Sequence, residues 1–425
     1  MKRWLCSVVP AVLLALSVGQ IYAFTLFSSE IASYIGRSQS AVQFAFSLGI
    51  FFLGMGAAFF GPLVERDVKM SAFFGACLFL AGLCCTQQGI AYKSLSLIYL
   101  GYGFMIGLGT GIIYITPVKT MMMWFPKKRA IAAAVPIIAF GLGSSLCALL
   151  HGGFSFSSSL LSCSFAGFSS FGILHVFYAY AAFYAVLMAV GAVLLRKPTV
   201  EEETKGLTYE ESVKRTTAYD FSEPEKTSTF YRRLVGDSYF KSAWLFMFLN
   251  ISAGLCLIPL AKQMMATVEC YGAAFAAAVV MAMGFANGGG RFIFAWWSDS
   301  MRERVRILPT ISVISAVVVL LGVCPTLIAV PLVALSACYG AGFSVIPAIL
   351  AEHYGMNDIS KIHGAVLSAW GFAGLVGNQV ACAVFGYKGV VGVVLIVLLA
   401  HLVNAQNALW LERRHKRDKM WGKSK

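Results

Sequence analysis

Acidic residues are few in this 425-residue chain, and none lies in the interior of a long apolar run. There are 19 Asp and Glu against 33 Lys and Arg, and the acidic residues nearest to apolar runs stand at their ends: Glu30, Glu65, Glu269, Asp299 and Glu352. Carriers that move protons or cationic solutes generally use a membrane-embedded carboxylate as a proton relay or counter-ion. The absence of such a carboxylate argues against a proton-driven carrier and against a carrier of cations. It favours a carrier of anions that works by exchange or by passive facilitation.

Motifs of catalytic and metal sites are missing as well. The 11 cysteines show no Cys-x-x-Cys or Cys/His spacing typical of a metal site, and most lie in apolar runs, where cysteine acts as a small hydrophobe. The chain has no recognisable nucleophile–base pair and no phosphate-binding glycine loop. We therefore predict no cofactor, no metal and no enzyme activity. His175 and His401 are possible proton relays, but an interfacial role for His175 and a structural role for His401 fit their positions better.

Long runs of apolar residues make up most of the sequence. Hydrophobic residues make up 59% of the chain and charged residues 12%. A helix needs about 20 apolar residues to cross roughly 30 Å of hydrocarbon. Twelve such runs can be drawn, at 4–27, 42–64, 71–90, 96–118, 129–151, 172–195, 242–266, 271–297, 307–324, 326–350, 362–386 and 388–410. The first is too long for a signal peptide, so we expect an uncleaved span and an all-α membrane protein with 12 transmembrane helices.

Lys and Arg are distributed unevenly between the two sides of the predicted bundle. With the N-terminus inside, all but five lie at or near the inner face; Arg37, Lys93, Lys262 and Lys388 lie outside, and Arg291 lies within a run. This asymmetry is the positive-inside pattern, and it predicts a multi-pass protein of the cytoplasmic membrane with both termini cytoplasmic. The net charge of +14 therefore indicates a lipid-facing inner surface rather than nucleic-acid binding.

Six apolar runs precede a polar insert and six follow it. We expect an N-terminal six-helix half at 1–195, a cytoplasmic central linker at 196–241, a C-terminal six-helix half at 242–410 and a basic cytoplasmic tail at 411–425. The linker carries both signs of charge and is expected to be solvated, with one surface helix around Tyr209–Thr216. Two six-helix halves are typical of transporters built from paired repeats around a central cavity.

Short charged segments follow the second run of each half. Glu65 and Arg66 follow the second run of the chain, and Asp299 and Arg302 follow the eighth. A carboxylate just past a helix end, with a basic residue close by, can hold two helices together at the cytoplasmic face and release them on opening. Ordinary interfacial polar residues would give the same pattern. We take these four residues as candidates for gating.

Away from the ends of the predicted spans, Arg291 is the one Lys or Arg within a span. At helical spacing it shares a face with Gly284, Asn287, Gly288 and Ala295, which are all small or short and polar. Such a face suits close helix packing or the lining of a cavity, and a cation there needs water, carbonyl groups or an anion. We favour a substrate anion; the alternative is an arginine that extends toward the cytoplasmic headgroups.

Glycines recur at four-residue spacing in the fourth run, at Gly103, Gly107 and Gly111. Small residues let helices approach and slide, which alternating access requires. They are equally consistent with static close packing, and the sequence does not separate the two.

Several motifs carry a resemblance to a known family. They are Gly19-Gln-Ile-Tyr-Ala-Phe-Thr-Leu-Phe, Gly109-Thr-Gly-Ile-Ile-Tyr-Ile-Thr-Pro-Val-Lys-Thr, Trp124-Phe-Pro-Lys-Lys-Arg, Phe140-Gly-Leu-Gly-Ser, Asn250-Ile-Ser-Ala-Gly, Asn287-Gly-Gly-Gly-Arg, Tyr339-Gly-Ala-Gly-Phe and Trp370-Gly-Phe-Ala-Gly-Leu-Val-Gly. With its two six-helix halves and paired charged segments, the chain resembles the major facilitator superfamily, and these motifs resemble its oxalate/formate antiporter family. The similarity touches most spans and leaves out the central linker and the outer loop at 152–171.

The resemblance implies how a substrate is bound. A span-8 arginine of the family holds a carboxylate at the membrane midplane, and Arg291 matches it; its planar fork can bond both carboxylate oxygens. The family's oxalate carrier adds a lysine on span 11, where this chain has Trp370. One cation matches one negative charge, and a second carboxylate left unpaired in a dry cavity costs several kcal/mol. We therefore expect a monocarboxylate such as formate, lactate or pyruvate rather than oxalate.

The same resemblance implies further site residues. Tyr22 and Tyr114 match positions that line the family's site, and Phe140 stands where some relatives have tyrosine. Aromatic walls exclude water and a tyrosine hydroxyl can donate to a carboxylate oxygen, although plain packing is the alternative for each residue. Asn287 stands where the related monocarboxylate transporters carry an aspartate paired with their arginine. An asparagine can orient Arg291 but cannot take up a proton.

We predict a secondary transporter of small monocarboxylates that works by alternating access, as an exchanger or a facilitator, with Arg291 as the anion-binding cation. The expected partners are a small organic anion and the lipid bilayer, without nucleic acid, and the protein is expected to be a monomer. The alternatives are a carrier of another anion or of a neutral solute with a structural Arg291, and a membrane sensor that binds carboxylate without moving it. The short linker argues against the sensor.

Overall fold

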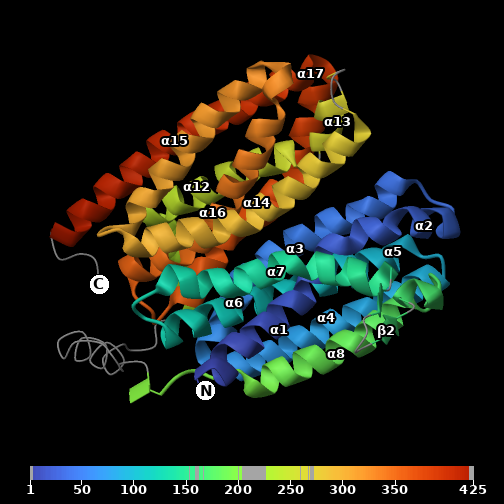
Figure 1. Cartoon of the computed structure of the whole chain (residues 1–425). Coiled ribbons are helices and arrows are strands. Elements are labelled where there is room, and N and C mark those ends of the chain that lie inside the picture. The colour runs from blue at the N-terminus through green and yellow to red at the C-terminus, as the bar shows by residue number, and fades with distance from the viewer. Residues whose placement is uncertain are drawn as a thin grey trace. The chain divides into compact units, whose positions relative to one another are not determined.

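The structure is a computed structural model (Figure 1), and it describes residues 3–152, 154–157, 162–165, 167–199, 201–202, 226–258, 260–266, 268 and 272–420. Its internal contacts divide the chain into two compact units. Unit 1 comprises Met1–Met121 and Val135–Lys197, and unit 2 comprises Met122–Ala134 and Pro198–Lys425. The short segment Met122–Ala134, which connects two spans of unit 1, therefore groups with unit 2.

Within the described residues, 12 helical stretches are long and apolar enough to cross a membrane. They are Trp4–Ile35, Gln39–Arg66, Val68–Ala91, Leu95–Trp124, Arg129–Gly152, Val176–Leu194, Ser238–Leu257, Ala278–Ser300, Arg304–Val323, Ala329–Tyr354, Ile359–Gly377 and Lys388–Met420. Each corresponds to one of the 12 apolar runs of the sequence. The predicted all-α membrane fold is therefore confirmed for the described part of the chain.

Unit 1 holds the first six spans. Its elements are a π-helical segment at Trp4–Val8, α1 (Val9–Val18), a 3-10 segment at Gly19–Phe24, α2 (Thr25–Ile35), α3 (Gln39–Arg66), α4 (Val68–Ala91), α5 (Leu95–Ile98), a π-helical segment at Tyr99–Ile106, α6 (Gly107–Trp124), α7 (Arg129–Gly152), a 3-10 turn at Phe168–Phe171 and α8 (Val176–Leu194). α4 packs against α8 and against the second π-helical segment, and α1 packs against α8. The first span thus changes its winding in the middle, at Gly19–Phe24, between α1 and α2.

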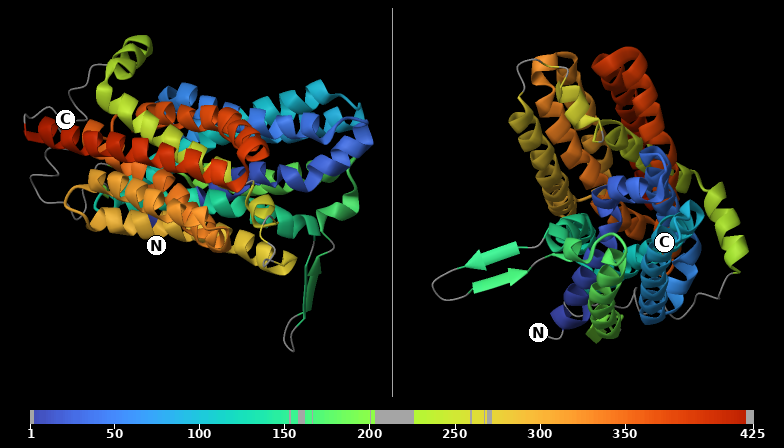
Figure 2. Two further views of the ribbon diagram at one scale, coloured as in Figure 1. Left: turned by 90° about the horizontal axis from the view of Figure 1, so that it is seen from above. Right: turned by 90° about the vertical axis from the view of Figure 1, so that its right-hand side faces the viewer.

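The connection between α7 and α8 contains a hairpin where the sequence predicts only an outer loop. β1 (Phe154–Ser157) and β2 (Ser162–Phe165) pair in antiparallel fashion, with Phe154 opposite Phe165. The hairpin projects away from the helices of unit 1 (Figure 2). β1 alternates Phe and Ser, and β2 alternates Ser with Cys and Phe, and that period of two is the pattern of a strand. Each strand spans four residues, far fewer than the roughly 20 apolar residues that mark a membrane span.

Unit 2 holds the other six spans. Its elements are α11 (Thr227–Gly236), α12 (Ser238–Leu257), α13 (Ala261–Ala266), α14 (Ala273–Ser300), a 3-10 turn at Arg304–Arg306, α15 (Ile307–Leu320), 3-10 turns at Leu321–Val323 and Pro325–Leu327, α16 (Ala329–Tyr354) and α17 (Ile359–Met420). α12 and α15 both pack against α17, and α14 packs against α16 (Figure 1). α17 contains two spans, joined at Gly389 by a left-handed backbone with φ of 64°.

The described part of the predicted tail differs from expectation, and the predicted linker is described only in part. Residues 411–420 of the predicted tail form the last turns of α17 rather than a separate tail. The helix predicted around Tyr209–Thr216 lies outside the described residues. α11 lies at the end of the predicted linker, directly before α12, and its Phe230 and Leu234 are buried.

The glycines of the fourth span pack closely against α3. A Cβ atom added to Gly107 would lie 2.7 Å from the carbonyl oxygen of Gly49, and one added to Gly111 would lie 2.2 Å from the carbonyl oxygen of Leu53. Both distances are far below van der Waals contact, so only glycine fits. These glycines therefore let the fourth span approach α3 closely, as both interpretations of the spacing require.

Candidate functional site

Arg291 lies on α14 with its side chain buried in unit 2. The residue is 6% exposed, and its Nε donates a hydrogen bond to Oδ1 of Asn287, one helical turn earlier, at 3.1 Å. Its guanidinium also lies over the ring of Phe343 on α16, 5.7 Å from the ring centroid. The bond to Asn287 directs the side chain back along α14, away from the end of the helix at Ser300. This geometry favours an interior position over extension toward the headgroups.

Close packing between α14 and α16 creates this arrangement. A Cβ atom added to Gly290 would lie 2.3 Å from the carbonyl oxygen of Ala337. One added to Gly340 would lie 2.3 Å from the carbonyl oxygen of Asn287 and 3.1 Å from Cγ of Arg291. The absence of a side chain at Gly290 and Gly340 lets the two backbones touch, and that contact brings the Phe343 ring under the guanidinium.

An alanine at Gly290 should therefore destabilise unit 2. Its Cβ would meet backbone atoms of α16, which cannot move aside cheaply, and overpacking of this kind typically costs about 1–3 kcal/mol. Gly289, its neighbour on α14, has no atom within 4 Å of such a Cβ and supplies the matched control. We expect Gly290→Ala to lower the midpoint of thermal unfolding in detergent and Gly289→Ala to leave it nearly unchanged. Equal midpoints for the two variants would contradict the packing described here.

Aromatic residues extend the site across α16 to α17. Phe343 contacts Trp370 on α17 at a centroid distance of 4.5 Å and Tyr339 on α16 at 5.3 Å. Asn250 on α12 donates from Nδ2 to the carbonyl oxygen of Tyr339 at 3.3 Å. The three predicted site residues of unit 2, Arg291, Asn287 and Trp370, thus belong to one cluster, and Phe343 connects them.

Phe343, Tyr339 and Asn250 were not predicted as site residues. All three lie in motifs that carry the family resemblance, so a signal for them exists in the sequence. What the sequence does not show is that the Tyr-Gly-Ala-Gly-Phe stretch of α16 runs directly beside Arg291, because that depends on the packing of α14 on α16.

The three predicted site residues of unit 1 form a second cluster. The ring of Phe140 on α7 lies 5.4 Å from that of Tyr22 in the first span and 5.2 Å from that of Tyr114 on α6, both in edge contact. Tyr114 and Phe140 are buried and Tyr22 is partly exposed. The 3-10 segment holds Tyr22 close to α7, because a Cβ atom added to Gly143 would lie 2.5 Å from Cα of Gly19.

Glu65, the first candidate for gating, takes part in an ion pair at the end of α3. Its carboxylate pairs with the ammonium of Lys119 on α6, and both side chains are nearly buried. Lys197, after α8, donates from Nζ to the carbonyl oxygen of Glu65 at 2.6 Å. Burial lowers the pKa of Lys197, and the neighbouring Lys119 adds to that effect, while Glu65 and Asp67 oppose it. Arg66 is exposed, so the basic partner of Glu65 comes from α6.

Asp299, the other acidic candidate, caps a helix. Its two carboxylate oxygens accept from the backbone N–H of Ala130 at 3.1 Å and of Ile131 at 2.9 Å, in the first turn of α7. A carboxylate at a helix N-terminus satisfies free N–H groups and interacts favourably with the helix dipole. These bonds explain why the segment Met122–Ala134 groups with unit 2.

The basic partner of Asp299 is Arg304, which was not among the candidates for gating. Arg304 donates from Nε to Asp299 Oδ1 at 3.0 Å and contacts Glu352 on α16 through its Nη1 at 3.3 Å. Arg302 is exposed. Arg304 lies in the 3-10 turn that follows α14, and this turn directs it toward Asp299; sequence spacing alone does not distinguish it from Arg302.

Comparisons with known proteins give the family. The Major Facilitator Superfamily model matches residues 9–378. The "Uncharacterized MFS-type transporter YhjX" of Escherichia coli is 25% identical over 378 residues, 88% of this chain and 86% of that protein. The "Oxalate:formate antiporter" of Oxalobacter formigenes is 30% identical over 143 residues, 33% of each chain. The solved proton:xylose symporter XylE superimposes with a TM-score of 0.71 at 14% identity, covering 94% of both chains, and so shares the fold. The chain therefore belongs to the Major Facilitator Superfamily.

Proposed function

We propose that this transporter carries small monocarboxylate anions, with the guanidinium of Arg291 as the group that binds the carboxylate. The observation that carries the proposal is the burial of Arg291 between α14 and α16, where the neutral amide of Asn287 and the ring of Phe343 hold it in place. A fixed, desolvated guanidinium offers a carboxylate two parallel hydrogen bonds with charge assistance. Burial strengthens this attraction, because the local dielectric constant is lower than in water.

Similarity to a carboxylate carrier supports this substrate class. The aligned relative from Oxalobacter formigenes is named for the exchange of oxalate and formate, which are both carboxylates, and 33% of the present chain aligns with it at 30% identity. Exchange also suits a buried cation. An unoccupied Arg291 must remain desolvated without its anion, so the loaded carrier should reorient more readily than the empty one.

Trp370 favours one carboxylate over two. Its indole packs on Phe343, 4.5 Å between centroids, and Phe343 in turn lies beneath the Arg291 guanidinium. This corner of the site therefore offers an apolar ring, and a second carboxylate placed beside it would lose its hydration without gaining a cation. Formate, lactate and pyruvate present one carboxylate and fit such a site.

The remaining candidates receive supporting roles in the proposal. Tyr22, Tyr114 and Phe140 form an aromatic cluster suited to excluding water and, through the hydroxyl groups, to contacting a carboxylate. Glu65 and Asp299 hold helix ends through an ion pair and a helix cap, and contacts of this kind must be released if those ends separate during transport. Arg66 and Arg302 are exposed and contribute basic charge near the two carboxylates.

Counterflow in proteoliposomes tests the proposal directly. Vesicles preloaded with formate, lactate, pyruvate or oxalate are diluted into labelled monocarboxylate, and uptake is followed against empty vesicles. We expect one or more monocarboxylates to drive uptake and oxalate to be weaker by about tenfold or more, because an unpaired buried carboxylate costs more than the roughly 1.4 kcal/mol that a factor of ten represents. Strong oxalate exchange would contradict the single-cation site. Absence of counterflow with all four, from protein shown to be folded, would contradict a carboxylate substrate.

A further inference from the structure

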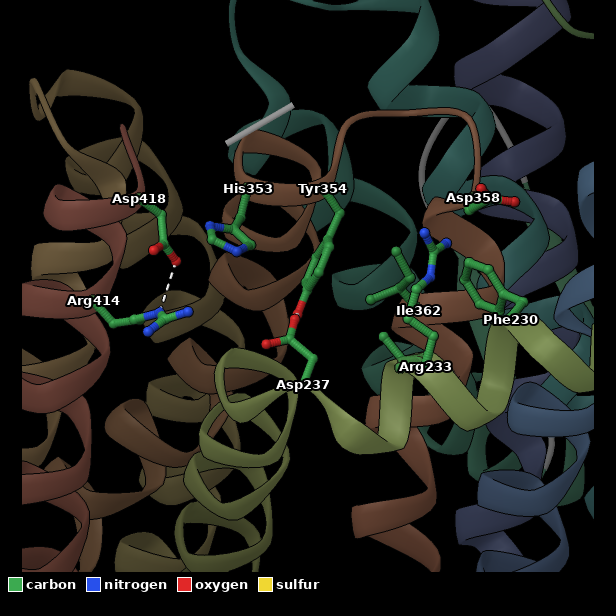
Figure 3. A pocket seen from close by; sticks show the side chains of 10 residues that line it. Phe230, Arg233, Asp237, His353, Tyr354, Asp358, Ile362, Arg414 and Asp418 are labelled. Atoms are coloured by element: carbon green, nitrogen blue, oxygen red, sulfur yellow. Dashed lines mark hydrogen bonds and ion pairs between the residues drawn. The ribbon is translucent and has the colours of Figure 1, made fainter. Parts of the chain in front are cut away.

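A pocket of about 380 Å³ lies at one end of unit 2, between α11, α16 and α17 and beside the start of α12 (Figure 3). Two bonded pairs line it: the Tyr354 hydroxyl donates to Asp237 Oδ2 at 2.5 Å, and Arg414 Nε donates to Asp418 Oδ2 at 2.9 Å. This end carries the basic last turns of α17, which is the side expected to be cytoplasmic from the distribution of Lys and Arg. His353 also lines this pocket.

His353 on α16 forms a pair with His415 on α17. The two Nδ1 atoms lie 3.3 Å apart, and the residues are 7% and 2% exposed. The ring of Tyr239 on α12 stacks on His353 with its centroid 3.6 Å away and the planes nearly parallel, at 5°. Three helices thus meet at this histidine pair, and its hydrogen bond joins the end of α17 to the end of α16.

Charged and titratable groups face the pair from every adjoining element. Tyr239 of α12 and Asp237, which caps the start of α12, face His353, as do Arg414 and Asp418 of α17. Glu352 of α16 lies 3.9 Å from Nε2 of His415, measured to Oε1. Glu303, which precedes the 3-10 turn after α14, and Lys419 of α17 act on His415 at longer range. Burial of both rings opposes added positive charge, and the neighbouring carboxylates offset that effect only in part.

The geometry of the pair makes it sensitive to proton number. An Nδ1–Nδ1 hydrogen bond needs one protonated and one unprotonated nitrogen, a condition that holds with no added proton or with one. A second added proton puts two donors and two positive charges against each other at 3.3 Å, which breaks the bond and repels the rings. Imidazole is the side chain that changes charge between pH 5 and 8, and two such groups in contact titrate as a pair.

The pair is connected to the helix cap of α7. Glu352, beside His415, also accepts from Arg304 Nη1 at 3.3 Å. Arg304 in turn bonds Asp299, whose carboxylate holds the first turn of α7. Within the described residues Nε2 of His415 has no hydrogen-bond partner, so a protonated His415 competes with Arg304 for Glu352.

We propose that His353 and His415 form a proton-sensitive lock that holds the end of α17 on α12 and α16. With at most one added proton the hydrogen bond persists and the last turns of α17 stay in place. When both rings are protonated the end of α17 detaches, and Glu352 shifts from Arg304 toward His415, which weakens the hold on Asp299. Acidification at this end of the protein thereby acts on the segment that caps α7.

Hydrogen–deuterium exchange of the purified, full-length protein in detergent tests the lock without any transport assay. The segment 408–420 is followed at pH 7.5 and pH 5.5, with the known pH dependence of intrinsic exchange removed. We expect its protection to fall by about tenfold or more at pH 5.5 in the parent, as a local opening with a protonation-dependent equilibrium requires. The double variant His353→Asn/His415→Asn keeps an amide at the position of each Nδ1 but cannot be protonated, so its protection should not depend on pH.

His401→Asn is the matched control. His401 is a buried histidine on the same helix, 4% exposed, away from the pair, and its variant should keep the pH response of the parent. The proposal is overturned if the parent shows no loss of protection at pH 5.5, a result that needs no variant, or if the double variant retains the full response. If the double variant fails to fold, the single variant His415→Asn replaces it, since one neutral partner already prevents the doubly charged state.

Discussion

Replacing Arg291 by glutamine is expected to reduce carboxylate counterflow by at least about 30-fold. Glutamine retains an amide but loses the positive charge and the forked pair of donors. Loss of one partner from a buried, hydrogen-bonded charge pair costs about 2–5 kcal/mol, which corresponds to about 30-fold up to several thousand-fold in affinity. The measurement is uptake of labelled pyruvate by preloaded proteoliposomes over a range of external concentrations, which separates weaker binding from slower reorientation.

Arg302→Gln is the control for this prediction. Arg302 follows α14, is exposed and carries the same positive charge as Arg291. Its replacement therefore tests whether the loss of any arginine in this part of the chain has the same effect. We expect Arg302→Gln to keep most of the parent's activity. If Arg291→Gln, shown by its thermal midpoint to be folded, moves carboxylate as well as Arg302→Gln does, Arg291 is a structural residue and the proposed binding site is wrong.

Replacing Trp370 by lysine is expected to shift preference from monocarboxylates toward oxalate by about tenfold or more. The indole lies on Phe343, and Phe343 lies under the Arg291 guanidinium, so a lysine from this position of α17 extends into the same cluster. Its ammonium would pair with the second carboxylate of oxalate, which the parent leaves unpaired at a cost of several kcal/mol. The ratio of oxalate-driven to formate-driven counterflow measures the shift.

Trp370→Met separates the added charge from the lost ring. Methionine fills part of the same volume with a flexible, neutral side chain. We expect Trp370→Met to leave the ratio of oxalate to formate counterflow close to that of the parent. Equal ratios in the Lys and Met variants would show that Trp370 controls the size of the site rather than its charge balance.

The spans could be predicted because the bilayer fixes their length and composition. Hydrocarbon thickness requires about 20 apolar residues per helix, and this requirement acts on sequence directly. The same reasoning identified Arg291, since a permanent charge within such a run needs a physical explanation. Asn287 could also be predicted as a neighbour of Arg291, because both lie on one helix and helical spacing places Asn287 one turn before Arg291.

Relations between helices could not be predicted in the same way. Phe343 lies under Arg291 only because glycines at Gly290 and Gly340 let α14 and α16 touch, and nothing in the spacing along either helix shows which faces meet. The choice of Arg304 over Arg302 depends on a 3-10 turn after α14. The contact between His353 and His415 joins residues 62 positions apart, and it requires α17 to continue beyond its apolar run.

The bond between Arg291 and Asn287 has an electrical consequence. An amide at position 287 adds no negative charge, so this residue pair carries one net positive charge. Under the proposed function a bound monocarboxylate neutralises this charge, and the charge is uncompensated when the anion leaves. Exchange of one monocarboxylate for another then moves no net charge, whereas the return of the empty site moves one, which a membrane voltage opposes or assists by about 2.3 kcal/mol per 100 mV for a full crossing. Under this function the exchange of anions is independent of the membrane voltage, and only net transport carries an electric current.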